Sequence, residues 1–154
     1  MIIRFAAAAA VALLLVGCGA FTAPSPTAGE MGDLVGGLVR RGATIANQVG
    51  GDAGCADANL YGNAVRYDMR GPTETNTVPI YVLRWKSDAT FRATENDFET
   101  CVAAYQAAHP YAALTVYEDV PWRVYGPDWS PAVKALVETV VHEAAGASAP
   151  AQPQ

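Results

Sequence analysis

The sequence is poor in the residues that build metal sites. The 154-residue chain has two histidines and three cysteines, and no Cys-x-x-Cys pair occurs. No histidine stands close to a cysteine, so the ligand spacing of a zinc site is missing. His142-Glu143 begins like the zinc-protease HExxH pattern, but Gly146 stands where the second histidine is needed. We therefore expect no metal and no cofactor.

Catalytic motifs are also scarce. Nucleophilic catalysis needs a Ser, Thr or Cys beside a base that a third group orients. The chain has four serines, and their surroundings indicate a tether, a turn, a helix cap and a tail: Ser25, Ser87, Ser130 and Ser148. Neither a G-x-S-x-G elbow nor a phosphate-binding glycine loop is present. The sequence predicts no catalytic residue, with an envelope hydrolase of unrecognised type as an alternative.

Basic residues are few and scattered. The formal net charge is -5, and Arg40-Arg41 is the only adjacent basic pair. A negatively charged chain without a basic patch is repelled by the phosphate backbone, so no nucleic-acid partner is expected.

Long hydrophobic runs are missing as well, and the longest lies at the N-terminus. Met1 to Arg4 carries one positive charge, and Phe5 to Val16 follows as an uninterrupted apolar run. The run has about a dozen residues, whereas a membrane-spanning helix needs roughly 20. A charged start and a short apolar stretch are typical of a cleavable signal peptide.

The signal peptide ends in Leu15-Val16-Gly17-Cys18. This motif resembles the lipobox of bacterial lipoproteins. The resemblance implies that residues 1–17 are removed and that Cys18 receives acyl chains, which anchor the protein to a membrane. The acidic retention signal is absent at Gly19, so the expected location is the outer face of the cytoplasmic membrane, or an outer membrane if the source has one. An uncleaved anchor or an ordinary secretory signal is the alternative.

The other two cysteines fit an oxidising compartment. Cys55 and Cys101 form an even pair outside the cytoplasm, where disulfides persist. A bond between them would close a loop of about 46 residues and contribute roughly 4 kcal/mol in the chain-entropy model. Free thiols or metal ligands are the weaker alternatives.

The rest of the chain predicts one small domain. Residues 18–30 form a flexible tether after the lipidated cysteine, residues 31–145 a single α+β domain, and residues 146–154 a disordered tail. We expect three helices and a small, mostly antiparallel sheet of three to four strands, in the order α-β-β-α-β-α, with one disulfide.

Hydrophobic periodicity places these elements along the chain. Apolar residues from Met31 to Val49 approximate one helical face, and residues 52–63 are loop-like. Alternation predicts a strand near 65–70, and an apolar run predicts an inner strand at 80–85. A helix follows over 94–108, then either one bent strand or a hairpin over 114–125. Ser130 and Pro131 begin the last helix, which carries the cleanest amphipathic stripe.

Aromatic residues gather on and beside the later strands. Those that could form an exposed binding face are Trp85, Trp122, Arg123, Tyr125 and Trp129. Trp, Tyr and Arg are enriched in binding hot spots, although aromatics on two-sided strands usually belong to the core. We expect a non-enzymatic binding or accessory module with an envelope protein or cell-wall partner. A small-ligand-binding or sensing domain is the alternative.

Overall fold

The computed structural model describes residues 29–146. The predictions for the signal peptide 1–17, for Cys18 and for most of the tether and tail lie outside the described residues. The described elements, in chain order, are α1 (Met31–Arg40), β1 (Thr44–Gly50), α2 (Ala58–Tyr61), β2 (Ala64–Arg70), β3 (Val78–Arg84), α3 (Asp88–Ala93), α4 (Glu95–Ala108), β4 (Leu114–Asp119), β5 (Trp122–Pro127) and α5 (Pro131–Ala144).

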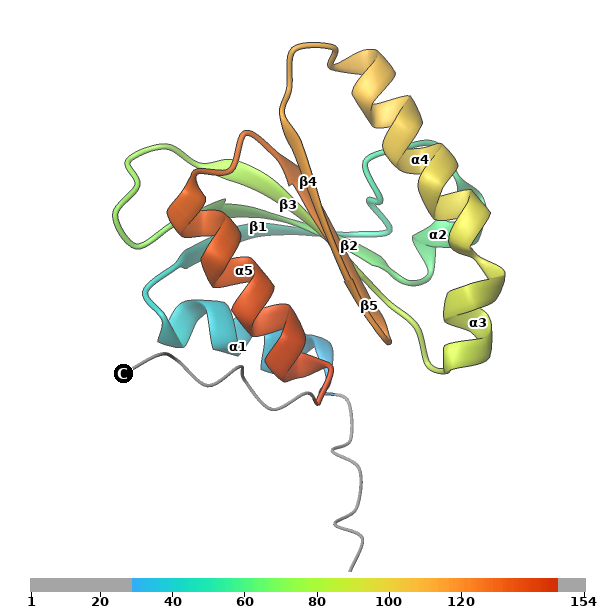
Figure 1. Ribbon diagram of the computed structural model, residues 1–154, viewed down its shortest axis with the longest axis horizontal. Coiled ribbons are helices and arrows are strands. Elements are labelled where there is room, and N and C mark those ends of the chain that lie inside the picture. Colours follow the sequence, from blue (N-terminus) through green and yellow to red (C-terminus); the bar gives the residue numbers. More distant parts are fainter. Residues whose placement is uncertain (1–28, 147–154) are drawn as a thin grey trace, which may run out of the picture.

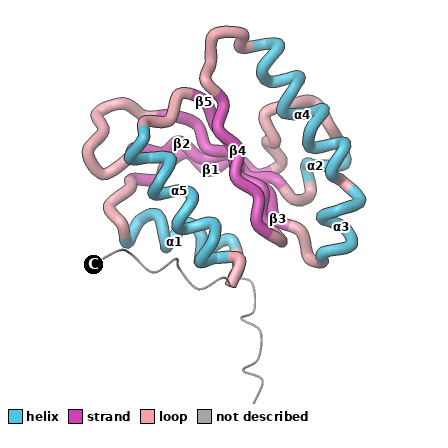
Figure 2. Tube along the Cα trace, in the orientation of Figure 1, coloured by secondary structure: helices cyan, strands magenta, loops and turns pink. Residues whose placement is uncertain are grey.

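The strands form one sheet in the order β1-β2-β3-β5-β4, and every neighbouring pair is antiparallel. The sheet lies in the middle of the molecule (Figures 1 and 2). Helices α1 and α5 cover one face, and α2, α3 and α4 cover the other. No helix within residues 29–146 is long and apolar enough to cross a bilayer.

The predicted fold was wrong in its element count and order. The structure has five strands and five helices in the described residues, in place of three to four strands and three helices. Strand β1 and the short helices α2 and α3 were missed, and residues 114–127 form a hairpin of two strands. Periodicity could not reveal α2 and α3, because four and six residues are too few to show a repeat.

Strand β1 lies where the sequence predicts the end of the first helix. Helix α1 ends at Arg40, and Gly42 has a φ of +90°, which turns the chain into the strand. Six of the seven β1 residues are exposed because β1 lies at the edge of the sheet. An exposed edge strand lacks the alternation that marks a half-buried strand, so Ile45 and Val49 matched a helical spacing by chance.

Alternating side chains of the central strands β3 and β5 build two separate cores. Ile80, Val82, Trp122 and Val124 face α1 and α5. The intervening residues face α2, α3 and α4. The α1–α5 core consists mainly of Leu34, Leu38, Tyr67, Met69, Ile80, Val82, Trp122, Val124, Trp129, Val133, Val137, Val140 and Val141. The α4 core consists of Ala53, Leu60, Ala64, Tyr81, Leu83, Trp85, Phe91, Phe98, Cys101, Tyr105 and Tyr125.

Helices α1 and α5 pack closely on their face of the sheet. A Cβ atom on Gly37 of α1 would lie 2.8 Å from a methyl carbon of Val140 on α5, so only glycine allows this approach. Helix α5 begins as predicted, with the Ser130 hydroxyl accepting a hydrogen bond from the Val133 backbone N–H at 3.3 Å.

Candidate functional site

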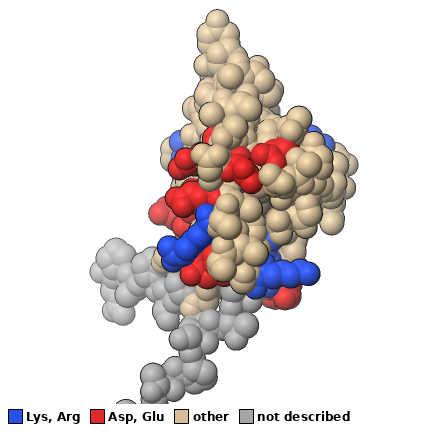
Figure 3. Space-filling model, turned by 90° about the vertical axis from the view of Figure 1, so that its right-hand side faces the viewer, with Lys and Arg blue, Asp and Glu red and all other residues tan. Residues whose placement is uncertain are grey.

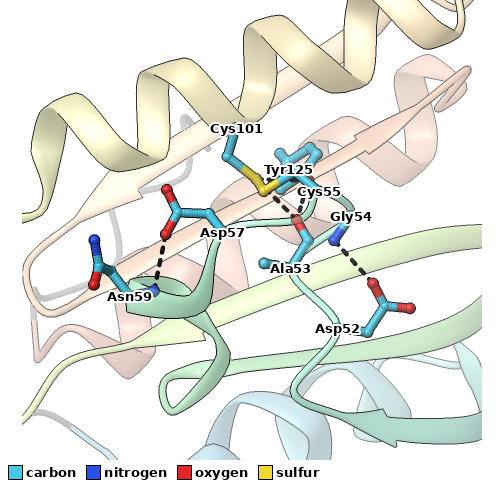
Figure 4. The surroundings of a disulfide bond; sticks show 8 residues. All are labelled: Asp52, Ala53, Gly54, Cys55, Asp57, Asn59, Cys101 and Tyr125. Atoms are coloured by element: carbon cyan, nitrogen blue, oxygen red, sulfur yellow. Dashed lines mark hydrogen bonds between the residues drawn. A yellow bond between two sulfur atoms is a disulfide. The ribbon is translucent and has the colours of Figure 1, made fainter.

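A disulfide holds the segment between β1 and α2 against α4 (Figure 4). Cys55 and Cys101 are bonded, with their Cα atoms 5.3 Å apart, and this is the pairing expected from the sequence. Beside Cys55, the Asp57 carboxylate accepts a hydrogen bond from the Asn59 backbone N–H at 2.8 Å and caps α2. The covalent bond and the cap together fix this loop.

Tyr125 extends from the central strand β5 to the same loop (Figure 4). Its hydroxyl donates a hydrogen bond to the carbonyl oxygen of Ala53, which is buried. The Cys101 Sγ atom lies 3.3 Å from that oxygen, but a disulfide sulfur has no proton to donate, so this is a packing contact. Tyr125 thereby satisfies a carbonyl group that burial has removed from water.

Three tyrosine rings pack around Gly54. Gly54 has a φ of +78°, and a Cβ atom there would lie 3.0 Å from Tyr81 and 3.2 Å from Tyr105. Tyr81 and Tyr125 stack with 4.8 Å between ring centroids. Burial raises the pKa of both hydroxyls above the ordinary value of 10.0, so they stay neutral at physiological pH. This cluster is therefore structural.

The predicted aromatic binding face was wrong. Trp85, Trp122, Arg123, Tyr125 and Trp129 are all at most 4% exposed. They also do not share a surface. Trp85, Arg123 and Tyr125 face α4, whereas Trp122 and Trp129 face α1 and α5. Strands covered on both faces bury every residue, so aromatic side chains along them fill the two cores.

Arg123 is buried among aromatic rings and is 1% exposed. Its guanidinium carbon lies 4.0 Å from the ring centroid of Phe91 and 5.0 Å from those of Trp85 and Phe98. Its Nε donates to Glu118 at 2.7 Å, and Glu118 is the cross-strand neighbour on β4. The Nη1 atom has no hydrogen-bond partner within residues 29–146, so the rings and one carboxylate stabilise this charge.

A groove with a volume of about 340 Å³ is lined in part by Phe98 and Glu118, the ring and the carboxylate that contact Arg123. We call it the α4–β4 groove, and its lining residues are Phe98, Glu99, Val102, Ala103, Val116 and Glu118. The first four belong to α4 and the last two to the edge strand β4. Its floor is apolar, and one carboxylate stands on each side. Val116 is 37% exposed although it is apolar.

Charged and uncharged parts of the surface meet near the groove. Figure 3 shows acidic side chains across the α2–α4 side of the molecule, with basic side chains among the lower ones, and above them a projecting tip without charged side chains. Residues 100–117, from α4 into β4, contain no Asp, Glu, Lys or Arg. Within this run Tyr111 is fully exposed. Sequence reasoning did not single out this run, yet it is the longest uncharged stretch of the described residues.

His142 lies on the opposite side of β4 from the groove. Its Nδ1 is 2.5 Å from Asp119 Oδ2, which forms a His–Asp pair. The hydroxyl nearest along the helix, Thr139, donates to the carbonyl oxygen of Ala135 at 2.8 Å and so bonds to its own helix. A hydrolase would need a nucleophile directed at the histidine. The pair links α5 to the end of the β4–β5 hairpin.

Metal ligation finds no geometric support either. Across the described part of the chain, no three His, Cys, Asp or Glu side chains are placed to hold one ion. Comparisons with protein-family models, with curated proteins and with solved structures gave no match.

Proposed function

We propose that this protein is a lipid-anchored binding module on the outside of a bacterial membrane, and that it binds a partner protein at the α4–β4 groove. The groove is the observation that supports partner binding. An apolar floor lies open beside an edge strand, with carboxylates at its rim. Exposed apolar surface rimmed by polar residues is typical of protein interaction sites.

The anchor half rests on the lipobox at Cys18, and the disulfide is consistent with it. A bond between Cys55 and Cys101 persists in an oxidising compartment and is rare in the cytosol. No enzymatic step is proposed: beside the His142–Asp119 pair, the Thr139 hydroxyl donates to a carbonyl oxygen of its own helix.

The start of the domain lies at one end of the sheet, and strand β4 begins at the other end. Arg84 donates through Nε to the carbonyl oxygen of Gly29 at 2.9 Å and pairs with Glu30 at 3.0 Å. Arg84 pairs in register with Trp122 at one end of the sheet, whereas β4 begins at the other end, with Leu114. An anchor before Gly29 would therefore leave the β4 start and the uncharged tip directed away from the membrane.

The anchor is tested by labelling living bacteria with a clickable fatty acid. We expect label on the wild-type chain and none on Cys18→Ser, because the thiol is the acylation site in lipoproteins. Loss of the label should be accompanied by release of the chain from the membrane fraction, since acyl chains supply the membrane affinity. Equal labelling of both chains would refute lipidation at Cys18.

The binding surface is tested by a photo-crosslinking amino acid placed in intact cells. We expect a discrete adduct from position Val116 and none from Val39, which is 50% exposed on α1 on the other face of the sheet. Ala103→Arg should abolish the adduct because it fills the groove. Ala107→Arg is the matched control, since Ala107 is exposed one turn further along α4 and does not line the groove. The same adducts from Val116 and Val39 would place the partner elsewhere.

A further inference from the structure

We propose that the partner of the α4–β4 groove is an extended segment that adds as a strand to β4 and carries a Lys or Arg side chain into the space between Glu99 and Glu118. This inference rests on the proposed function, because it states which kind of partner the groove takes. It follows from the geometry of the two sheet edges, the direction of the β4 side chains and the charge at the groove.

The two edges of the sheet differ in their readiness to accept another strand. In β1 the register with β2 shifts between Ala46 and Val49, and Asn47 has a φ of +49°. Such a bulge twists an edge away from pairing. In β4 the register with β5 is unbroken from Leu114 to Asp119. The β4 edge therefore has the regular geometry that strand addition requires.

The β4 edge also lacks the charges that commonly block pairing along most of its length. Leu114 to Tyr117 are uncharged, and acidic residues occur only at the end of the strand. Charged side chains on an edge strand discourage the addition of another chain. An incoming segment can thus pair along the first four residues, with its basic residue toward the acidic end.

Side chains of β4 alternate between the two faces of the sheet. Val116 and Glu118 line the groove, whereas Tyr117 stacks on Trp129, with 6.3 Å between ring centroids, on the other face. A segment paired with β4 would direct every second side chain into the groove. An apolar residue would cover Val102 and Val116, and the residue two positions along would reach the carboxylates.

The charge of the groove selects a basic residue at that position. None of the six lining residues is basic. Arg123 holds one oxygen of Glu118 from below at 2.7 Å and is 1% exposed, so it orients the carboxylate but does not enter the groove. The Glu99 carboxylate and the second Glu118 oxygen remain available to a cation.

The same charge argues against a second copy of this chain as the occupant. The chain has a net charge of -5, and its own β4 ends in two acidic residues. Pairing of β4 with its copy would bring no basic side chain of β4 toward the carboxylates. Electrostatic complementarity therefore favours a different, basic partner.

The proposal is tested with the chain as the cell produces it, purified in detergent, and three synthetic peptides, TVTKTV, TVTETV and TVPKTV. NMR titration should show that TVTKTV perturbs the backbone signals of β4 and of residues 98–103. TVTETV should bind at least about tenfold more weakly, because like charges would meet. TVPKTV should also bind weakly, because proline removes a backbone N–H donor.

A charge reversal in the groove provides the matched test of specificity. Glu99→Lys should remove the preference for TVTKTV over TVTETV, because it leaves one negative and one positive charge in the groove, and 0.5 M salt should reduce the preference of the wild type. Glu95→Lys is the control, since it makes the same charge change on α4 outside the groove and should leave the preference intact. Both protein variants lie at exposed positions, so their folds should persist.

The remaining outcomes each decide the question. Equal binding of all three peptides, perturbation only of residues other than β4 and 98–103, or a dimer that forms through β4 would overturn the basic-strand proposal. If no peptide binds but the Val116 adduct forms in cells, the proposed function stands and the strand proposal fails. If neither is observed, both fail.

Discussion

The two faces of the sheet carry cores of different chemistry, although the same strands supply both. Toward α1 and α5 the core is mostly aliphatic, and the two helices pack closely through Gly37 and Val140. Toward α4 the core is aromatic, contains a disulfide and encloses the Arg123 guanidinium. The difference shows that non-directional packing can stabilise the layer on one face of a sheet, while a few specific bonds contribute to the layer on the other.

This difference determines where a groove can form on the surface. The α1–α5 core needs only apolar side chains of suitable volume, which cover the sheet continuously. On the other face a disulfide joins α4 to the Cys55 loop, an ion pair joins β5 to β4, and α4 leaves the edge strand β4 uncovered beside it. The α4–β4 groove is the result, so the stability of the α4 core and the shape of the groove depend on the same contacts.

The largest effect is expected from removing the disulfide. Cys55→Ala and Cys101→Ala should each lower the free energy of unfolding by about 4 kcal/mol, because the unfolded chain loses a long closed loop. The double variant should lose little more, and this non-additivity is measured by chemical denaturation. Native-state hydrogen exchange should rise in α4 and the Cys55 loop more than in α1 and α5. A uniform rise across both layers would remove the distinction between the two faces.

The parts of the fold that the sequence predicts are those with long periodic patterns or clear caps. Helix α5 shows an apolar stripe that begins after Ser130, and the acidic residues Glu95 and Asp97 mark the first turn of α4. Strand β3 was read as an inner strand because its apolar run leaves no wet face, and it is central in the sheet. These signals are local, so one sequence suffices to find them.

The parts that could not be predicted depend on tertiary position. Strand β1 is exposed at an edge and so lacks an alternating pattern. The aromatic residues were assigned to a surface, yet composition cannot tell which face of a strand another layer covers. The groove requires α4 and β4 to lie side by side, and no local pattern encodes that contact. The uncharged run 100–117 is visible in the sequence, but it does not indicate that α4 and β4 lie side by side.

The second effect on stability concerns the ion pair beneath the groove, and it should be asymmetric. Arg123 is 1% exposed, whereas the Glu118 side chain is 42% exposed. Glu118→Gln leaves a buried guanidinium without its counter-ion and should cost about 2 kcal/mol. Arg123→Met replaces the cation by an apolar chain of similar length among aromatic rings and leaves a carboxylate that water can solvate. That variant should stay within about 1 kcal/mol of the wild type.

The control for this asymmetry lies on the other face of the sheet. Arg41 and Glu143 form an ion pair at 2.5 Å in which both side chains are about one-third exposed. Glu143→Gln should change the free energy of unfolding by less than about 1 kcal/mol, because water screens the pair and solvates the residual charge. If Arg123→Met instead costs more than Glu118→Gln, the contacts of the cation with the surrounding rings outweigh its carboxylate partner. The α4 core would then depend on aromatic packing around Arg123, and the groove carboxylate would be free to serve binding alone.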